Sequence, residues 1–109
     1  MEMNDMTEEQ YRTYSDYLLA GTHRLRGRHG FRIPALVVDQ WHQQGYAVLR
    51  TNTLAKHFGV QRKTMWRTIQ GVVDAGFIRE IGRTDDGKAK YVPCLERGAE
   101  WRACREARS

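Results

Sequence analysis

The sequence predicts a mainly α-helical protein with one small β-hairpin, which is an α+β fold class. Apolar residues recur at three- and four-residue steps in several segments, as they do on the buried face of a helix. Two later segments are rich in β-forming residues and flank the turn dipeptide Asp86-Gly87. The chain has 109 residues, of which 40% are apolar, so we expect one domain with one hydrophobic core.

The N-terminal part of the chain predicts a first helix. Thr7 and Gln10 match the capping-box pattern Thr-x-x-Gln, so the helix is expected to start after Thr7 and to end between Gly21 and Gly30. The stretch "HRLRGRHGFR" that follows is expected to be a basic loop or a frayed helix end. The apolar stripe of the helix is expected to consist of Tyr11, Tyr14, Leu18 and Leu25.

A second helix is expected before Gly45. Pro34 suits the first turn of a helix, and Gly45 suits its C-terminal stop. The sequence "YAVLR" is short and β-rich, which predicts a brief strand over residues 46–50. The apolar face of the second helix is expected to contain Ala35, Leu36, Val38 and Trp41.

Two further helices joined by a tight turn are expected next. The first should begin with Thr51 or Asn52 as its cap and end at Gly59. The second should run from residue 61 or 62 to about Ala75 and be closed by Gly76.

The residues between these two helices meet the packing requirements of a close helical pair. Ala55 is small enough for the helices to cross closely, Gly59 accepts a positive φ, and Val60 fills the corner. The side chains expected to face inward are Leu54, Phe58, Met65, Ile69, Val72 and Val73.

The remainder of the chain predicts a hairpin of residues 77–83 and 90–95 and a last helix over residues 96–107. This order of elements is typical of a winged helix-turn-helix domain. In that arrangement the N-terminal helices occupy residues 7–45, the helix-turn-helix residues 51–76, the wing residues 77–95, and the C-terminal helix residues 96–107. The whole chain, residues 1–109, would then be a single DNA-binding domain.

The charge distribution favours a polyanionic partner. The formal net charge is +5, and between residues 40 and 73 there are five lysines and arginines and no carboxylate. A basic surface without acids attracts a polyanion, and the counterions released on binding make the attraction strong and salt-sensitive. The alternative is an ordinary solvated face that happens to be basic.

The helical wheel of the segment after Val60 predicts which side chains face outward. An α-helix fits the DNA major groove, where Arg, Lys and Gln can bond base edges. The residues expected to contact DNA from this helix are Lys63, Arg67 and Gln70, with Thr64 and Trp66 beside them and Arg62 reaching solvent from the first turn. An ordinary helical hairpin with a soluble outer face is the alternative.

Two other groups are expected to contact the DNA backbone. Thr51, Asn52 and Thr53 open the preceding helix, where backbone N–H groups and hydroxyls can hold a phosphate. The wing carries basic residues that can reach a neighbouring minor groove or its phosphates, namely Arg83, Lys88 and Lys90. A plain hairpin with a solubilising turn is the alternative for the wing.

A family resemblance rests on these same residues. "TNTLAKHFGVQRKTMWRTIQGVVDAGFIREIG" resembles the helix-turn-helix and first wing strand of winged-helix transcription regulators. The continuation "TDDGKAKYVPCLERGAEW" is similar to the wing and following helix of the multiple-antibiotic-resistance-regulator type, MarR. The resemblance implies a dimer on a pseudo-palindromic site, with residues 61–70, Gln61 included, in the major groove and residues 83–90 as the wing. It identifies neither the operator nor a small-molecule effector.

No enzyme, metal or cofactor chemistry is expected. The four histidines pair with no other His or Cys at metal-ligand spacing, and no nucleophile motif, phosphate loop or carboxylate pair is found. Cys94 and Cys104 are expected to be packing thiols, with a redox sensor as the alternative. The acidic N-terminus does not match a secretory signal, and the apolar runs are too short to cross a bilayer, so the protein is expected in the cytoplasm.

The expected function is sequence-specific binding of double-stranded DNA as a transcriptional repressor or regulator. The tyrosines of the first helix could form a partner-binding face with Trp41, but a Tyr/Leu stripe at helical spacing is more often core or a homodimer seam. A homodimer built from this helix, with the C-terminal helix around Trp101, is expected, because a winged helix has few helices to cover the stripe. Two alternatives stay open. One is a DNA-binding accessory factor in plasmid or phage maintenance, replication or recombination. The other is a winged-helix module that binds or inhibits another protein.

Overall fold

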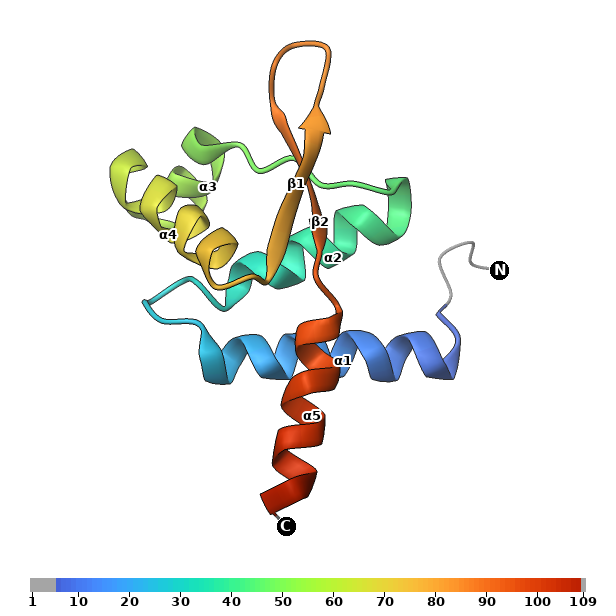
Figure 1. The fold of residues 1–109 in the computed structure, drawn as a ribbon. Coiled ribbons are helices and arrows are strands. Elements are labelled where there is room, and N and C mark those ends of the chain that lie inside the picture. The colour runs from blue at the N-terminus through green and yellow to red at the C-terminus, as the bar shows by residue number, and fades with distance from the viewer. Residues whose placement is uncertain (1–5, 109) are drawn as a thin grey trace.

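The structure is a computed structural model and describes residues 6–108. This part of the chain contains five helices and a two-stranded hairpin. The hairpin projects from one side of the molecule and the end of the last helix from the other (Figure 1). The mainly helical α+β class predicted from the sequence is therefore confirmed. The elements are α1 (Glu8–Arg24), α2 (Arg32–Gln44), α3 (Thr51–Phe58), α4 (Arg62–Asp74), β1 (Ile78–Arg83), β2 (Ala89–Pro93) and α5 (Glu96–Arg108).

Most helix ends lie where the local sequence placed them. The capping box is formed, since the Gln10 backbone N–H donates to the Thr7 hydroxyl and the Thr7 backbone N–H donates to the Gln10 side chain, each at 3.0 Å. Gly45 and Gly59 end α2 and α3 with φ of 90° and 69°, in the left-handed region where glycine carries no steric cost.

The start of α3 differs from the prediction. The capping residue is Arg50, and its side chain makes no capping hydrogen bond. Thr51 and Asn52, predicted as the cap, are instead the first helical residues. Within residues 6–108, no side-chain hydrogen bond caps α4 either, where Gln61 occupies the cap position. Both helices therefore begin with backbone N–H groups that have no intrahelical partner.

The strand predicted over residues 46–50 was wrong apart from a single bridge. Ala47 and Tyr91 exchange two backbone hydrogen bonds of 2.8 Å, but pairing does not continue. The Gln40 side chain takes both backbone groups of Val48, accepting from its N–H at 3.0 Å and donating to its carbonyl at 3.2 Å. Because a side chain satisfies these groups, the segment needs no neighbouring strand.

The hairpin pairs Ile78 with Pro93 at its base and Arg83 with Ala89 near its tip. The register shifts between Glu80 and Gly82, so one strand carries a bulge there. At the tip, the Gly87 backbone N–H donates to the Thr84 carbonyl at 2.9 Å, which closes the turn that Asp86-Gly87 predicted. The strands are shorter than predicted, but the hairpin and its turn are confirmed.

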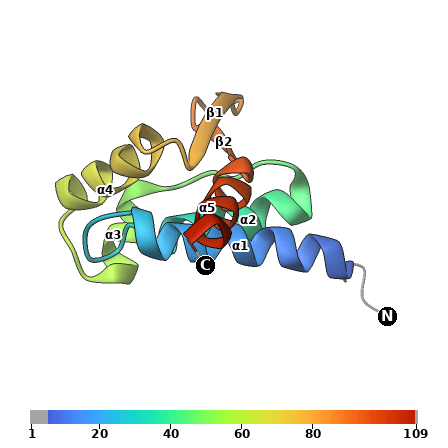
Figure 2. The ribbon, with the colours of Figure 1, turned by 60° about the horizontal axis from the view of Figure 1, so that its bottom comes forward.

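The two terminal helices cross at very close range. α5 packs across α1, as both views show (Figures 1 and 2). At the crossing, Gly98 is buried against the α1 backbone, where a Cβ atom would lie 2.7 Å from the Tyr17 Cα and closer still to the Tyr17 nitrogen. Only glycine fits such an approach. An ion pair between Arg102 and Asp16, with an N–O distance of 2.6 Å, flanks the crossing.

Tyr17 connects this crossing to the end of the α3–α4 pair. Its side chain has no exposed surface, and its hydroxyl donates a hydrogen bond to the Phe77 carbonyl, just before β1. The Tyr17 and Phe77 rings also pack at a centroid separation of 5.6 Å. Burial raises the pKa of the Tyr17 hydroxyl, so it stays a proton donor at every physiological pH.

On α1 and α2, some of the buried residues are not the ones predicted to form the apolar stripe. On α1, Tyr14 is buried as expected, but Tyr11 is 64% exposed and Tyr17 takes its place in the core. On α2, Val38 is buried as expected, whereas Ala35 is exposed and Val37 lies fully inside. Which residues are buried depends on where α5 and β2 pack against these helices. The spacing of apolar residues within one helix does not reveal those positions.

The tyrosines of α1 were expected to lack cover within one chain, and for Tyr14 and Tyr17 this expectation was wrong. Tyr14 and Tyr17 do not lack internal cover, because α2 and α5 both pack on α1. Trp101 of α5 is itself only 7% exposed and stacks on His23 with ring centroids 5.4 Å apart. These side chains are therefore core residues of the single chain.

Replacing Gly98 with Ala is expected to destabilise the fold. The added methyl group meets the Tyr17 backbone, which cannot yield like a flexible side chain, and overpacking of this kind costs about 1–3 kcal/mol or more. Urea unfolding measures the change. Gly71→Ala in exposed α4 is the matched control: nothing lies within 4 Å of its added Cβ, so it is expected to stabilise by about 0.5–1 kcal/mol. Equal effects of the two variants would contradict the close crossing.

Replacing Tyr17 with Phe is expected to lower the free energy of unfolding by about 1 kcal/mol. The hydroxyl bond to Phe77 is lost, but that carbonyl keeps its second donor, the Cys94 N–H at 2.8 Å. Tyr11→Phe removes the same atom from an exposed ring and should leave stability unchanged. Thermal unfolding of both variants gives the comparison, and no difference between them would remove Tyr17 as a connecting residue.

Candidate nucleic-acid interface

The inner face of α4 holds the helix against the body of the protein. Met65, Ile69 and Val72 are at most 3% exposed, and Val73 is half-buried. Ala55 of α3 is buried beside them, as expected for the close point of the α3–α4 pair. The predicted inward stripe is confirmed, so the opposite side of α4 faces solvent (Figure 1).

The outer face of α4 carries most of the side chains that the sequence assigned to DNA contact. Trp66 is 55% exposed, an unusual degree for so large an apolar ring, and Gln70 is half-buried. Arg62 is also exposed, as expected for a long side chain in the first turn of the helix. The exposed positions are Gln61, Arg62, Lys63, Thr64, Trp66 and Arg67.

Three consecutive residues of α4 project in different directions. Successive residues of a helix are rotated by about 100°, so Arg62 and Thr64 point to opposite flanks and Lys63 points outward between them. The Arg62 flank faces the hairpin and the start of α3, because Arg62 lines a cavity together with residues of both.

This cavity brings together three groups that the sequence had assigned separately. It has a volume of about 260 Å³ and lies between α3, the first residue of α4 and the hairpin tip. Its polar lining consists of Arg50, Thr51, Asn52, Thr53, Arg62 and Lys88. The first residues of α3, whose N–H groups lack a side-chain cap, are among those that line it. Cations, hydroxyls and free N–H groups around one cavity form a site suited to a phosphate.

One carboxylate moderates the charge of this cavity. A hydrogen bond from the Thr84 hydroxyl holds the pKa of Asp86 below its ordinary value, and the nearby charges of Arg50 and Lys88 lower it further. Asp86 is therefore ionised and offsets part of the positive charge of the cations. Since Arg50, Arg62 and Lys88 all line the cavity, a positive surplus remains.

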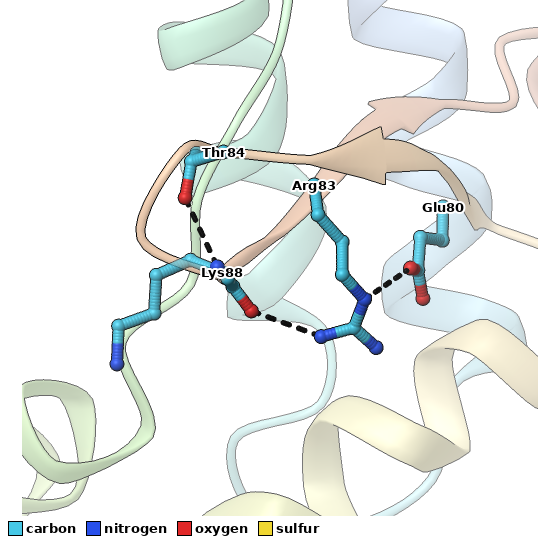
Figure 3. A network of polar contacts seen from close by, with 5 residues as sticks. Glu80, Arg83, Thr84 and Lys88 are labelled. Atoms are coloured by element: carbon cyan, nitrogen blue, oxygen red, sulfur yellow. Dashed lines mark hydrogen bonds and ion pairs between the residues drawn. The ribbon is translucent and has the colours of Figure 1, made fainter.

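The three basic residues predicted on the hairpin have different roles. Arg83 donates to the Gly87 carbonyl at 2.9 Å and lies 3.6 Å from the Glu80 carboxylate, so it braces the hairpin itself. Lys90 pairs with Gly82 and places its ammonium 4.6 Å from the centre of the Tyr46 ring. Lys88 extends away from the Arg83 guanidinium, as Figure 3 shows, and reaches the cavity. Of the three, Lys88 is the residue placed with the other candidate contacts.

Arg50 is a site residue that sequence reasoning missed. It was assigned to a short strand, whereas it caps α3 and lines the cavity. The sequence feature that could have identified Arg50 is its place immediately before a helix N-terminus. A basic side chain there lies beside the free N–H groups of the first turn.

The far end of α3 is held by the loop between α1 and α2, residues 25–31. The His29 ring stacks on the Phe58 ring with centroids 5.0 Å apart and planes 7° from parallel. The Arg32 guanidinium lies 5.5 Å from the centre of the same ring. Both ring nitrogens of His29 are inaccessible and have no hydrogen-bond partner within residues 6–108. Desolvation lowers the pKa of His29, and Arg32 and Arg28 lower it further.

We expect the stability of the fold to fall as the pH drops below the ordinary histidine pKa of 6.5. The lowered pKa means that the unfolded chain binds a proton on His29 more readily than the folded protein does, so acid favours unfolding. His29→Phe keeps the stacked ring and removes the titration. Melting temperatures across this pH range should therefore fall less steeply for His29→Phe than for wild type. An identical pH profile for both proteins would contradict this assignment.

Both cysteines are unpaired thiols. Cys94 is buried, and burial raises the pKa of its thiol, with the Glu96 charge adding to the effect. A raised pKa makes a thiol less reactive, which favours the packing role expected for Cys94. Within residues 6–108, no group of three His, Cys, Asp or Glu side chains is placed to hold a metal ion. In the same part of the chain, no helix combines the length and apolarity that crossing a membrane requires.

Comparisons with known protein families, with curated proteins and with solved structures found no match for this chain. The functional proposal therefore rests on the residues and geometry of the chain itself.

Proposed function

We propose that this chain is a winged helix-turn-helix protein that binds double-stranded DNA and regulates transcription. In this proposal α3 and α4 are the helix-turn-helix, α4 enters the major groove, and the β1–β2 hairpin is the wing. Lys63, Arg67 and Gln70 would contact base edges, with Thr64 and Trp66 beside them. Arg62, Lys88, Arg50 and the first turn of α3 would contact the backbone.

The observation that carries the proposal is the cavity beside Arg62. It joins the outer face of α4 to the first turn of α3 and to the hairpin tip, so one surface combines an exposed cationic helix with a polar site suited to phosphate oxygens. A helix placed in the major groove needs this kind of support at its side, because phosphate contacts set its register and orientation on the duplex.

A homodimer on a pseudo-palindromic site is part of the proposal. Tyr14 and Trp101 are buried within the chain and are not available to a second copy. Tyr11 and Leu19 of α1 are 64% and 43% exposed, so they are the apolar side chains of this helix that a second copy would cover.

A salt series with duplex DNA tests the proposal. Wild-type protein should bind mixed-sequence duplex DNA with an affinity that falls linearly on a log–log plot against salt concentration, since bound phosphates release counterions. Selection from a random duplex pool should then yield a preferred sequence. A wild-type protein that binds no duplex at low salt would overturn the proposal and favour a protein-binding module.

Arg67→Ala is expected to weaken binding to the selected sequence by about 1–3 kcal/mol and to relax preference at one base position. A base contact carries sequence information, whereas a phosphate contact does not. Binding isotherms on the selected and on mixed-sequence duplexes measure both effects. Arg12→Ala removes the same charge from an exposed position on α1 and should bind like wild type. Equal affinities of Arg67→Ala and wild type for the selected sequence would remove Arg67 from the interface.

A further inference from the structure

A second cavity lies on the other flank of α4, away from the hairpin. It has a volume of about 540 Å³, opens to solvent, and is lined by α4 and by residues 24–27, where α1 ends and the α1–α2 loop begins. Its cationic side chains are Arg24, Arg26 and Arg67, and its hydroxyls come from Thr64 and Thr68. Neither the sequence patterns nor the proposed function assigns a role to Arg24 or Arg26.

The two cavities lie on opposite sides of α4. Arg62 lines the cavity beside the hairpin, and Thr64 lines the one beside the loop. Two residues along a helix correspond to a rotation of about 200°, so these side chains leave α4 in nearly opposite directions. In Figure 1 the hairpin lies to one side of α4 and the loop after α1 to the other. The outer face of α4 therefore has cations along both of its edges.

Within the described residues, 6–108, no carboxylate lines the second cavity, so none neutralises its charge there. Among residues 6–108, Arg24, Arg26 and Arg67 have no ion-pair partner. Both loop-side arginines are exposed. Three unpaired guanidiniums around one cavity favour an anion, because arginine presents several N–H donors to the oxygens of a phosphate.

The loop that carries Arg26 and follows Arg24 has a tightly folded backbone. Gly27 takes a φ of +91°, and a Cβ atom on Gly30 would lie 2.6 Å from the Arg26 carbonyl oxygen, so the loop folds back tightly on itself. The stack of His29 on Phe58 then ties the loop to α3. A surface that is already ordered loses less conformational entropy when it binds.

We propose that the end of α1 and the start of the α1–α2 loop, through Arg24 and Arg26, contact the phosphate backbone of the second DNA strand. This inference rests on the proposed function. The major groove is about 12 Å wide, and its two edges are the backbones of opposite strands. With α4 in the groove, the cavity beside the hairpin faces one strand and the cavity beside the loop faces the other. The protein therefore contacts the phosphate backbones on both edges of the major groove.

The salt dependence of binding tests the inference. The double variant Arg24→Ala/Arg26→Ala should lower the slope of log affinity against log salt by roughly 1.8, which corresponds to two lost phosphate contacts, and by the same amount on every sequence. Arg12→Ala/Arg108→Ala removes the same charge from exposed positions and should keep most of the wild-type slope. Arg24→Lys/Arg26→Lys keeps the charge and should retain the slope. Thermal unfolding establishes that each variant is folded.

Duplexes with neutral methylphosphonates on one strand at a time identify the strand. For wild type, neutral groups at the contacted positions of either strand should weaken binding. The loop variant Arg24→Ala/Arg26→Ala should lose its sensitivity on one strand, and Arg50→Ala/Lys88→Ala should lose it on the other.

Three results would overturn the inference. The second-strand contact would be wrong if Arg24→Ala/Arg26→Ala kept the salt slope of the control variant. It would also be wrong if this variant lost its sensitivity to methylphosphonates on the same strand as Arg50→Ala/Lys88→Ala. Either result would leave the proposed function in place. A wild-type protein that does not bind duplex DNA would remove the inference and the proposed function together.

Discussion

The arrangement of the molecule depends on the close crossing of α1 and α5. Gly98 lets α5 lie directly on the α1 backbone, and Tyr17 reaches from the same point to the Phe77 carbonyl. Arg97 adds a second tie, donating to the Gly76 carbonyl at 3.0 Å. Both acceptors belong to the turn between α4 and β1. The crossing therefore fixes where the hairpin leaves the body of the protein, and with it the position of Lys88 beside Arg62.

The candidate interface consists of groups that the fold leaves unsatisfied. α3 and α4 both begin without a side-chain cap in the described chain, so their first N–H groups remain available. Among residues 6–108, the guanidiniums on either side of α4 are likewise not engaged in ion pairs, whereas Arg97 and Arg102 of α5 are paired with Glu100 and Asp16.

The hairpin contains both basic residues that stabilise the fold and a basic residue that lines the candidate phosphate site. Arg83 and the Thr84–Asp86 pair stabilise its tip, and Lys90 contacts the Tyr46 ring outside the hairpin. Lys88 lies among these residues and is the one that lines the cavity. Alternation of side chains along a strand and the turn at Gly87 separate Lys88 from Arg83 in space, although both are basic and close in sequence.

The sequence by itself determined the local features of the protein. The capping box at Thr7, the left-handed glycines at the ends of α2 and α3, the hairpin turn, and the inward stripe of Met65, Ile69 and Val72 all depend on interactions within a few residues. These patterns also identified most of the exposed cationic face of α4.

The tertiary structure alone decided which faces of α1 and α2 are buried, which predicted strand is replaced by the Gln40 side chain, and which arginines meet around α4. Each of these depends on contacts between segments far apart in the chain, such as Gly98 on Tyr17 or Lys88 beside Arg50. The periodicity of one element does not specify its partner, because many partners can cover the same apolar stripe.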